Sequence, residues 1–263
     1  FVGLDEPFRL EESLCECMQF HRISLREYPV FDHQPYALAL ASQLADLIDH
    51  QHIDVIHSHY ALPHAVSAHL AREISGRADV RLVTTLHGTD ITIVGSHPSM
   101  ANITRYSIHR SDAVTAVSHQ LKQDTVDKLQ IDPDHIEVIH NFVNLETFCP
   151  ERRLPGLVAD GEQVIVHVSN LRSVKAPLDV IEAFAGVRAQ LGGHVRLWVI
   201  GEGPLQAEME TRGRALDIEE HVRFWGSHRD VAPLLACADA LLCTSVTESF
   251  GLTLLEAMAC GVP

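Results

Sequence analysis

The sequence predicts an α/β protein made of two Rossmann-like domains, each with a doubly wound parallel sheet. Short runs rich in β-branched residues alternate with longer helical patterns, a succession typical of parallel sheets covered by helices on both faces. The length of 263 residues exceeds one average domain. Residues 141–161 hold two prolines, several charges and no periodicity, and they interrupt the alternation. We therefore expect an interdomain link there and domains covering residues 1–148 and 149–263.

Eight apolar runs are the expected strands, four in each domain. Those of the first domain are Ile53–His57, Arg81–Leu86, Ala113–Ala116 and Ile136–Ile139, with helical patterns at Pro35–His50 and Pro63–Ile74. Those of the second are Val164–Val168, Val195–Ile200, Val222–Phe224 and Ala240–Cys243, with a helical pattern at Leu178–Gln190. Ligands of doubly wound sheets bind beyond the carboxyl ends of the strands, so we expect the site in a cleft where the two domains face each other.

The composition excludes several classes of partner. With 35 acidic and 20 basic residues, the net charge of -15 repels phosphate backbones and anionic membrane surfaces, so we expect no nucleic-acid partner. No apolar stretch approaches the roughly 20 residues that span a bilayer, and no signal peptide is visible, which favours a soluble, cytoplasmic protein. The chain begins at Phe1 rather than Met and stops at Pro263 within an apolar run, so we expect it to be truncated at both ends.

The six cysteines show no spacing typical of a metal or redox site. We expect them to be reduced residues, largely of the core: Cys15, Cys17, Cys149, Cys237, Cys243 and Cys260.

The strongest motif runs from Glu248 to Gly261 and combines a strand, a turn at Ser249-Phe250-Gly251 and a helix. Glycine allows the backbone to approach a ligand, and the amides that open a helix favour a diphosphate. In this arrangement Glu256 can accept the two hydroxyls of a ribose, and Glu248 can reach hydroxyls of a sugar. An amphipathic helix with two surface glutamates is the competing interpretation.

A second motif follows the strand Val164–Val168, where Ser169-Asn170-Leu171 leads to Arg172 and Lys175. A guanidinium binds phosphate oxygens in a bidentate manner and an ammonium adds a point charge. Together they can neutralise a diphosphate without a metal ion. Gly201, after the strand Val195–Ile200, adds a glycine turn at the same edge of the sheet.

Polar residues also follow two strands of the first domain. His87, Gly88 and Thr89 come after one strand, and we expect His87 either to donate a hydrogen bond to a sugar hydroxyl or to shield the reacting centre. Four histidines, His52, His57, His59 and His64, suggest zinc, and His57 and His59 share one strand face. No cysteine or carboxylate completes a ligand set, so we expect no metal. Asp132-Pro133-Asp134 matches an Asp-x-Asp metal motif, but its proline predicts a turn.

Together these motifs resemble the retaining GT-B glycosyltransferases of family 4. Glu248 and Glu256 match that family's paired glutamates, and Arg172 and Lys175 match its diphosphate clamp. The resemblance implies a nucleotide-sugar donor, no metal cofactor, and catalytic roles for His87, Glu248, Arg172 and Lys175. The donor-binding residues that it implies are Asn170, Arg172, Lys175, Gly201, Glu248, Ser249, Phe250, Gly251, Leu252 and Glu256. The strand and glycine-rich loop that open this family are not visible, nor is its closing helix.

Segments such as HSHYALPHAV and TTLHGTDIT carry a narrower resemblance. They look like the bacterial family members that transfer N-acetylglucosamine from UDP-GlcNAc to L-malate in the first step of bacillithiol biosynthesis. This resemblance implies two small-molecule substrates, is compatible with a homodimer, and places Tyr60, Thr89 and Arg105 on the acceptor side. Another acceptor (an inositol phosphate, a lipid carrier or a polysaccharide) stays open, as does a non-catalytic protein that binds sugar nucleotides.

Overall fold

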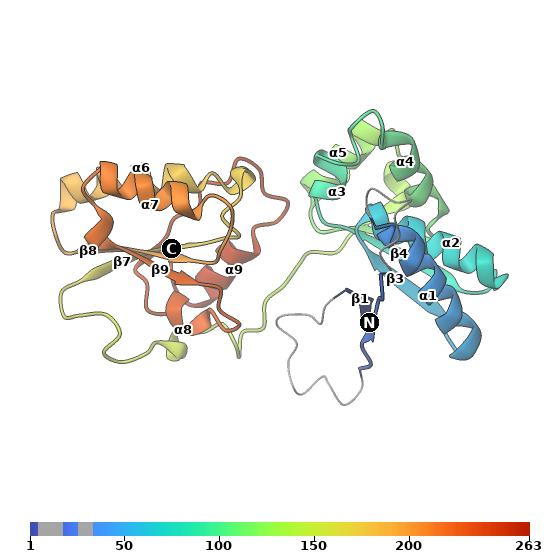
Figure 1. Ribbon diagram of the computed structural model, residues 1–263, viewed down its shortest axis with the longest axis horizontal. Coiled ribbons are helices and arrows are strands. Elements are labelled where there is room, and N and C mark those ends of the chain that lie inside the picture. Colours follow the sequence, from blue (N-terminus) through green and yellow to red (C-terminus); the bar gives the residue numbers. More distant parts are fainter. Residues whose placement is uncertain (5–17, 26–33) are drawn as a thin grey trace. The chain divides into compact units, whose positions relative to one another are not determined.

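A computed structural model describes residues 1–4, 18–25 and 34–263. The chain forms two compact units, Phe1–Asn141 and Phe142–Pro263 (Figure 1). The units part at the start of the predicted link, a few residues before the boundary that we expected between residues 148 and 149. Cys15 and Cys17 lie outside the described residues.

The sheet of the first unit has four parallel strands in the order β3-β4-β5-β6. They are β3 (Val55–His59), β4 (Arg81–Leu86), β5 (Ala113–Ala116) and β6 (Ile136–Val138). A separate parallel pair consists of β1 (Val2–Gly3) and β2 (His21–Arg22). The prediction of β4 and β5 is confirmed at both ends. The first strand begins two residues later than predicted, because the amide of Ile53 donates to the carbonyl of Gln51 in a turn.

The described part of the first unit contains five helices: α1 (Tyr36–His50), α2 (Val66–Ser75), α3 (Thr89–Thr92), α4 (Ala101–Arg110) and α5 (His119–Leu129). α1 packs on α2, and Ile48 and Ala71 from these helices share a buried cluster with Leu82 of β4. The helix predicted from Pro63 begins at Val66, after a π-helical turn, η2 (Ala61–Ala65).

Short 3₁₀ turns connect several elements: η3 (Pro133–His135), η4 (Pro150–Arg152), η5 (Ser173–Lys175) and η6 (Glu219–His221). At η3 the carboxylate of Asp132 accepts the amide of Asp134 at 2.9 Å, which confirms the predicted turn in Asp132-Pro133-Asp134.

The sheet of the second unit has four parallel strands in the order β10-β7-β8-β9. They are β7 (Gln163–Val168), β8 (Val195–Ile200), β9 (Val222–Gly226) and β10 (Ala240–Leu241), and the helices are α6 (Pro177–Leu191), α7 (Gln206–Ala215), α8 (Ala232–Leu235) and α9 (Leu252–Ala259). Successive side chains of β8 point to opposite faces. Leu197 packs in the cluster that contains Phe184 of α6, and Trp198 packs in the cluster that contains Leu235 of α8. Figure 1 accordingly shows α6 and α7 on one face and α8 and α9 on the other, so this sheet is doubly wound.

The last predicted strand is shorter than expected, which corrects one cysteine assignment. β10 ends at Leu241 rather than Cys243, and Cys243 is exposed, whereas Cys237 and Cys260 are buried. The backbone leaves the sheet after Leu242, whose carbonyl lies against the ring of His167 in β7 rather than against a backbone amide of that strand.

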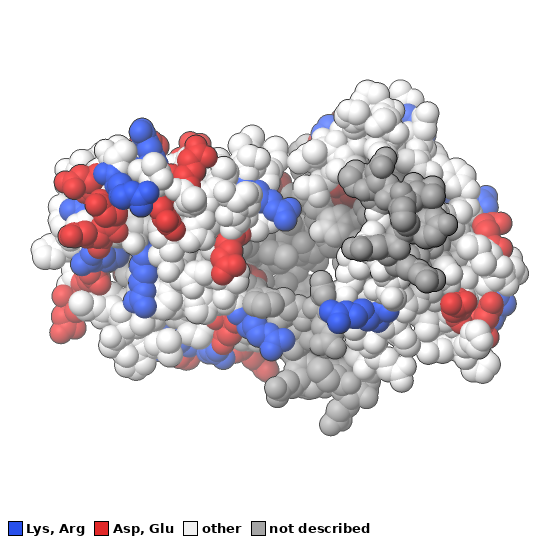
Figure 2. All heavy atoms as spheres, viewed as in Figure 1, with Lys and Arg blue, Asp and Glu red and all other residues white. Residues whose placement is uncertain are grey.

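Two surface properties bear on partners. Among the described residues, no helix combines the length and the apolar character that crossing a membrane requires. On the visible face of the second unit, acidic and basic side chains are interspersed (Figure 2).

Candidate active site

The strand order of the second unit brings three predicted loops to one edge of its sheet. β7 lies between β10 and β8, and all three strands are parallel. Their carboxyl ends therefore share an edge, where ligands of such sheets bind. The loop 169–176 lies in the middle, with the loops 201–205 and 242–251 on either side.

Gly201 and Gly203 let two of these loops pack together. A Cβ on Gly201, whose φ is +114°, would lie 1.9 Å from the carbonyl oxygen of Ser169. A Cβ on Gly203 would lie 2.2 Å from the carbonyl oxygen of Asn170. Because no side chain fits at these distances, both glycines are needed to build this edge, whether or not Gly201 also contacts a donor.

The loops 169–176 and 242–251 are joined by backbone and side-chain contacts. The hydroxyl of Thr244 lies 3.0 Å from the carbonyl oxygens of both Lys175 and Ala176. The amide of Val246 donates to the carbonyl of Val174 at 3.0 Å. The amine of Lys175 forms an ion pair with the carboxylate of Glu248. The structure thus brings together two predicted residues that are 73 positions apart.

The two predicted cations differ in their surroundings. Arg172 and its neighbour Asn170 are exposed. Within the described part of the chain, no side chain or carbonyl pairs with the guanidinium of Arg172. The charge of Lys175 is already compensated by Glu248. Arg172 is therefore the cation that is available to an incoming anion, and Lys175 becomes available when its ion pair opens.

Gly251 and Glu256 define the turn and helix of the strongest motif. Gly251 has a φ of +81° and precedes α9, so the amides of Leu252 and of the next residue lie in the open first turn of the helix. Ser249 and Phe250 are partly buried. Glu256 is only 8% exposed, which contradicts the interpretation of two surface glutamates. Burying a carboxylate is costly unless it is hydrogen-bonded or paired, so Glu256 is part of the packed interior rather than of the surface.

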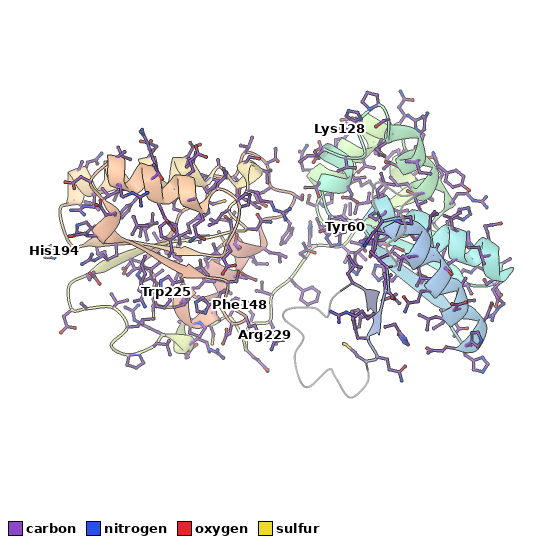
Figure 3. The ribbon with its side chains drawn as sticks, viewed as in Figure 1. Tyr60, Lys128, Phe148, His194, Trp225 and Arg229 are labelled. Atoms are coloured by element: carbon purple, nitrogen blue, oxygen red, sulfur yellow. The ribbon has the colours of Figure 1, made fainter. Side chains whose placement is uncertain are left out.

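In the first unit, the loops that follow β3 and β4 place aromatic side chains together. Nδ1 of His59 lies 2.8 Å from Nε2 of His87, and the ring centroids of Tyr60 and His87 are 4.8 Å apart. Tyr60 is labelled in Figure 3. Tyr60 has a φ of +79°, a conformation uncommon for a residue with a side chain. The family resemblance implied a catalytic role for His87 and an acceptor-side position for Tyr60, and the two rings are neighbours here.

A buried carboxylate fixes both loops. Asp90 is 3% exposed, and it accepts the amides of Gly88 at 2.9 Å, His87 at 3.2 Å and Ala61 at 2.9 Å. Thr89 beside it is exposed at the start of α3. Asp90 was not among the residues predicted for the site, although a carboxylate two residues after a glycine is typical of a turn that binds its own backbone.

Two histidines of this cluster, His59 and His87, are neutral at neutral pH. Partial burial, together with the charges that His57, His87 and His64 would carry, lowers the pKa of His59 to about 4. Burial also lowers the pKa of His87. Burial and the charge of Asp90 raise the pKa of Tyr60, so its hydroxyl keeps its proton. These groups therefore offer hydrogen bonds to a ligand rather than charge.

The geometry gives these histidines other partners than a metal ion. The rings of His57 and His59 stack with centroids 4.6 Å apart, which confirms their shared face. Nε2 of His57 lies 2.8 Å from the hydroxyl of Thr85, and Nδ1 of His64 donates to the carbonyl of His59 at 2.5 Å. Among the described residues, no three His, Cys, Asp or Glu side chains are grouped to hold a metal.

A cavity of about 600 Å³ in the first unit borders this cluster. His57, Ser58, His59 and His64 contribute to its wall, together with apolar residues of α1.

Arg105 lies on α4 and donates from Nε to the carbonyl of Leu129, the last residue of α5, at 2.7 Å. The structure thus uses Arg105 to satisfy a helix end.

Matches to known families cover both units. Residues 2–147 match the family described as Glycosyltransferase Family 4, and residues 151–263 match the one described as Glycosyl transferases group 1. The chain belongs to glycosyltransferase family 4.

Two relatives indicate where this glycosyltransferase lies within the family. It is 40% identical over its whole length to N-acetyl-alpha-D-glucosaminyl L-malate synthase from Bacillus anthracis and spans 69% of that protein. It is 31% identical over 81% of its length to D-inositol 3-phosphate glycosyltransferase from Salinispora tropica, and the aligned part is 49% of that protein.

Solved glycosyltransferase structures share the fold. HepE from Anabaena, in complex with UDP and glucose, superposes with a TM-score of 0.75 at 20% identity, covering 96% of this chain and 68% of HepE. WaaG, a glycosyltransferase involved in lipopolysaccharide biosynthesis, gives a TM-score of 0.68 at 17% identity, covering 93% of this chain and 66% of WaaG. The predicted GT-B fold with two Rossmann-like domains is confirmed.

Proposed function

We propose that the full-length protein transfers N-acetylglucosamine from UDP-GlcNAc to the hydroxyl of L-malate, the first step of bacillithiol biosynthesis. The observation that carries this proposal is the 40% identity to an L-malate synthase along the whole chain. The identity to D-inositol 3-phosphate glycosyltransferase is lower, and the match covers less of the chain. A cytoplasmic location and a homodimer belong to the same proposal.

The donor binds at the loop edge of the second unit in this proposal. Arg172 binds the diphosphate, since its guanidinium is exposed and fits phosphate oxygens in a bidentate manner. Lys175 adds its charge after Glu248 has turned to the sugar hydroxyls. Glu256 accepts the hydroxyls of the ribose. Residues 249–252 and Asn170 supply the backbone and side-chain contacts around the sugar and the phosphates, beside Gly201.

The acceptor binds at the loop edge of the first unit. His87 donates to the sugar, and its second ring nitrogen bonds to His59. Tyr60 and Thr89 offer hydroxyls to malate, and the guanidinium of Arg105 offers a charge to one of its carboxylates. Asp90 supports this edge by holding the backbone of both loops.

The reaction then needs neither a metal ion nor a covalent intermediate. The bond from the anomeric carbon to the diphosphate oxygen breaks, and the malate oxygen attacks from the same face, so the anomeric configuration is retained. The departing diphosphate oxygen takes the proton of the malate hydroxyl. Catalysis rests on stabilising the charge of the leaving group and on orienting the acceptor.

An acceptor screen tests the function. The full-length protein is incubated with UDP-GlcNAc and either L-malate or inositol phosphate, with and without EDTA, while UDP release and product mass are followed. We expect product with malate only, unaffected by EDTA and with the α configuration by NMR. Product with inositol phosphate overturns the acceptor assignment, and UDP binding without transfer to either acceptor favours a non-catalytic binding protein.

The clamp has its own test. Removal of one preorganised hydrogen-bond donor from a catalytic site commonly lowers the rate by about 10²- to 10³-fold. We expect Arg172→Ala to lower kcat/KM by that order. Arg153→Ala is the matched control, because Arg153 lies at the end of η4, outside the three loops. Near-normal turnover by the Arg172 variant would remove the clamp from the mechanism.

A further inference from the structure

A buried histidine lies next to the loops 169–176 and 242–251, where the donor is proposed to bind, and the proposed function gives it no role. His167 is part of β7 and is 2% exposed. Its Nδ1 lies 2.9 Å from the carbonyl oxygen of Leu242, and its Nε2 lies 2.8 Å from the hydroxyl of Ser169. The same hydroxyl oxygen accepts the amide of Leu171 at 3.2 Å. A chain of three hydrogen bonds thus connects the end of β10 with the loop 169–176.

The chemistry of these groups fixes the direction of each bond. A carbonyl oxygen only accepts, so Nδ1 of His167 carries the hydrogen. Burial lowers the pKa of this histidine, and the charge of Lys175 lowers it further, so the ring is neutral and Nε2 has a lone pair. Ser169 therefore donates its hydroxyl hydrogen to Nε2 and uses an oxygen lone pair for the amide of Leu171.

The residue at the end of this chain has an unusual backbone. Leu171 is fully buried and has a φ of +36°, in the left-handed region that residues with side chains seldom occupy. Such conformations cost on the order of 1–3 kcal/mol and persist where the surroundings impose them. The hydrogen bond to Ser169 is one such constraint, and the next residue along the chain is Arg172.

We propose that His167 and Ser169 are positioning residues that hold the turn at Leu171 and thereby direct Arg172 toward the donor diphosphate. The inference rests on the proposed function, because it takes Arg172 as a ligand of the diphosphate. His167 is too deeply buried to touch a substrate, so it acts on the loop 169–176 through Ser169.

A purely structural role for the pair makes a different prediction. Buried polar pairs stabilise a fold, and their loss lowers the melting temperature without changing the ligand affinity of molecules that remain folded. A positioning role lowers affinity in the folded protein. UDP affinity and melting temperature, measured on the same variants, separate the two roles.

The test uses the full-length protein and UDP as the probe, by calorimetry at a temperature where every variant is folded. Ser169→Ala and His167→Leu each break the chain, and we expect each to weaken UDP binding about tenfold, the equivalent of one hydrogen bond. Because both break the same chain, the double variant should bind UDP no more weakly than the weaker single variant. His167→Gln keeps a donor and an acceptor and should restore part of the affinity.

Asp239→Asn is the matched control. The carboxylate of Asp239 accepts the amide of Val164 at 2.7 Å, at the opposite end of β7. This variant should lower the melting temperature and leave UDP affinity unchanged.

Each outcome decides one point. Wild-type affinity in Ser169→Ala and His167→Leu overturns the positioning role while the proposed function stands. Losses that multiply in the double variant overturn the connected chain, because they mean that the two residues act independently. A wild-type protein that does not bind UDP overturns the proposed function, and the inference falls with it.

Discussion

The amine of Lys175 is paired with the carboxylate of Glu248, and each side chain is 27% exposed. Lys175 follows β7 and Glu248 follows β10, so the pair connects the loops 169–176 and 242–251 at the carboxyl edge of the second sheet. In the proposed function a diphosphate competes with Glu248 for the charge of Lys175, so binding of the donor would include an exchange of ionic partners.

This exchange predicts opposite effects of Glu248→Gln on binding and turnover. Exposed ion pairs contribute about 0.2–1 kcal/mol, so releasing Lys175 should strengthen UDP binding up to about fivefold. Turnover with UDP-GlcNAc should fall by about tenfold or more, because a charged hydrogen bond to the sugar is lost. Glu182→Gln, which breaks the surface pair with Arg212, is the control. Weaker UDP binding by the Glu248 variant would contradict the competition.

Replacement of Gly201 should damage the donor edge. A Cβ there meets the carbonyl of Ser169, and the φ of +114° is unsuited to alanine, so we expect Gly201→Ala to lower the free energy of unfolding by about 1–3 kcal/mol and to weaken UDP binding. Gly186 lies inside α6 with open space around it, and Gly186→Ala should stabilise the second unit by about 0.5–1 kcal/mol. Urea unfolding followed by tryptophan fluorescence reports on this unit, because Trp198 and Trp225 both belong to it.

The neutral state of His59 predicts sensitivity to acid in the first unit. Its pKa is about 4 in the folded protein and about 6.5 when unfolded, so the unfolded chain binds the proton more readily between these values. The contribution of neutral His59 is therefore complete above pH 6.5 and is lost as the pH falls toward 4. The melting temperature, followed by circular dichroism, should drop less between pH 7 and pH 5 in His59→Gln than in the wild type. Equal drops would show that His59 does not titrate in this way.

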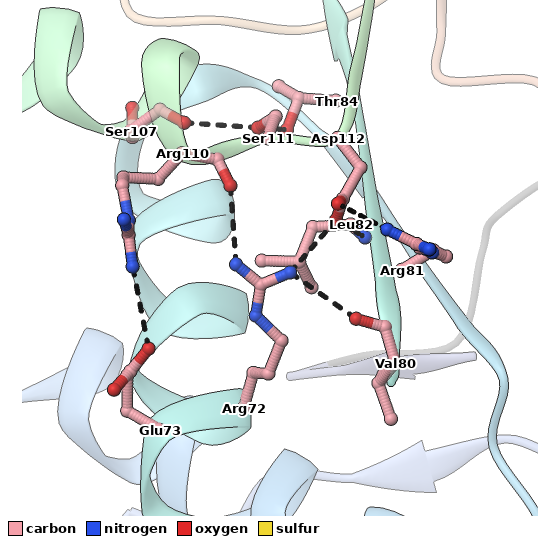
Figure 4. A network of polar contacts seen from close by, with 10 residues as sticks. All are labelled: Arg72, Glu73, Val80, Arg81, Leu82, Thr84, Ser107, Arg110, Ser111 and Asp112. Atoms are coloured by element: carbon pink, nitrogen blue, oxygen red, sulfur yellow. Dashed lines mark hydrogen bonds and ion pairs between the residues drawn. The ribbon is translucent and has the colours of Figure 1, made fainter. Parts of the chain in front are cut away.

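Asp112 organises the opposite edge of the first sheet, and its replacement should affect stability alone. It accepts from Arg72 at 2.8 Å, from Arg81 at 3.1 Å and from the amide of Leu82 at 2.8 Å (Figure 4). Burial acts against ionisation of Asp112, but these donors outweigh it and hold its pKa below the usual value.

We expect Asp112→Asn to lower the free energy of unfolding by about 1–3 kcal/mol, because the partly buried Arg72 loses its counter-charge. UDP affinity should be unchanged. Asp79→Asn, which removes an exposed partner of Arg77, is the control and should have little effect. A stable Asp112 variant would mean that water replaces the network.

Strand positions could be predicted from local sequence where polar or glycine residues flank an apolar run. Val195–Ile200 is bounded by charged and glycine residues, and the predicted strand is the observed one. The run Ala240–Cys243 has no such limit, because apolar character alone does not tell where a backbone leaves the sheet. The pair β1 and β2 has two residues in each strand, too few to form a periodic pattern.

The site was predictable as a set of loops but not as a set of contacts. The polar residues after each strand included Lys175 and Glu248, but only the strand order β10-β7-β8 makes their loops neighbours. Strand order depends on long-range packing and cannot be inferred from local sequence. His167 was missed as a functional residue because a histidine inside an apolar strand gives no sign of its partners. The helix end that Arg105 satisfies also depends on tertiary packing.

The backbone conformation of Tyr60 is unfavourable, which affects efforts to stabilise the protein. Its backbone has a φ of +79°, which glycine adopts without strain. A designer who optimises stability alone would therefore choose glycine at this position and delete the ring that lies against His87. If Tyr60 lines the acceptor site as proposed, thermostability and substrate recognition make opposite demands on this one residue, and a library selected only for heat resistance should drift there toward inactive proteins.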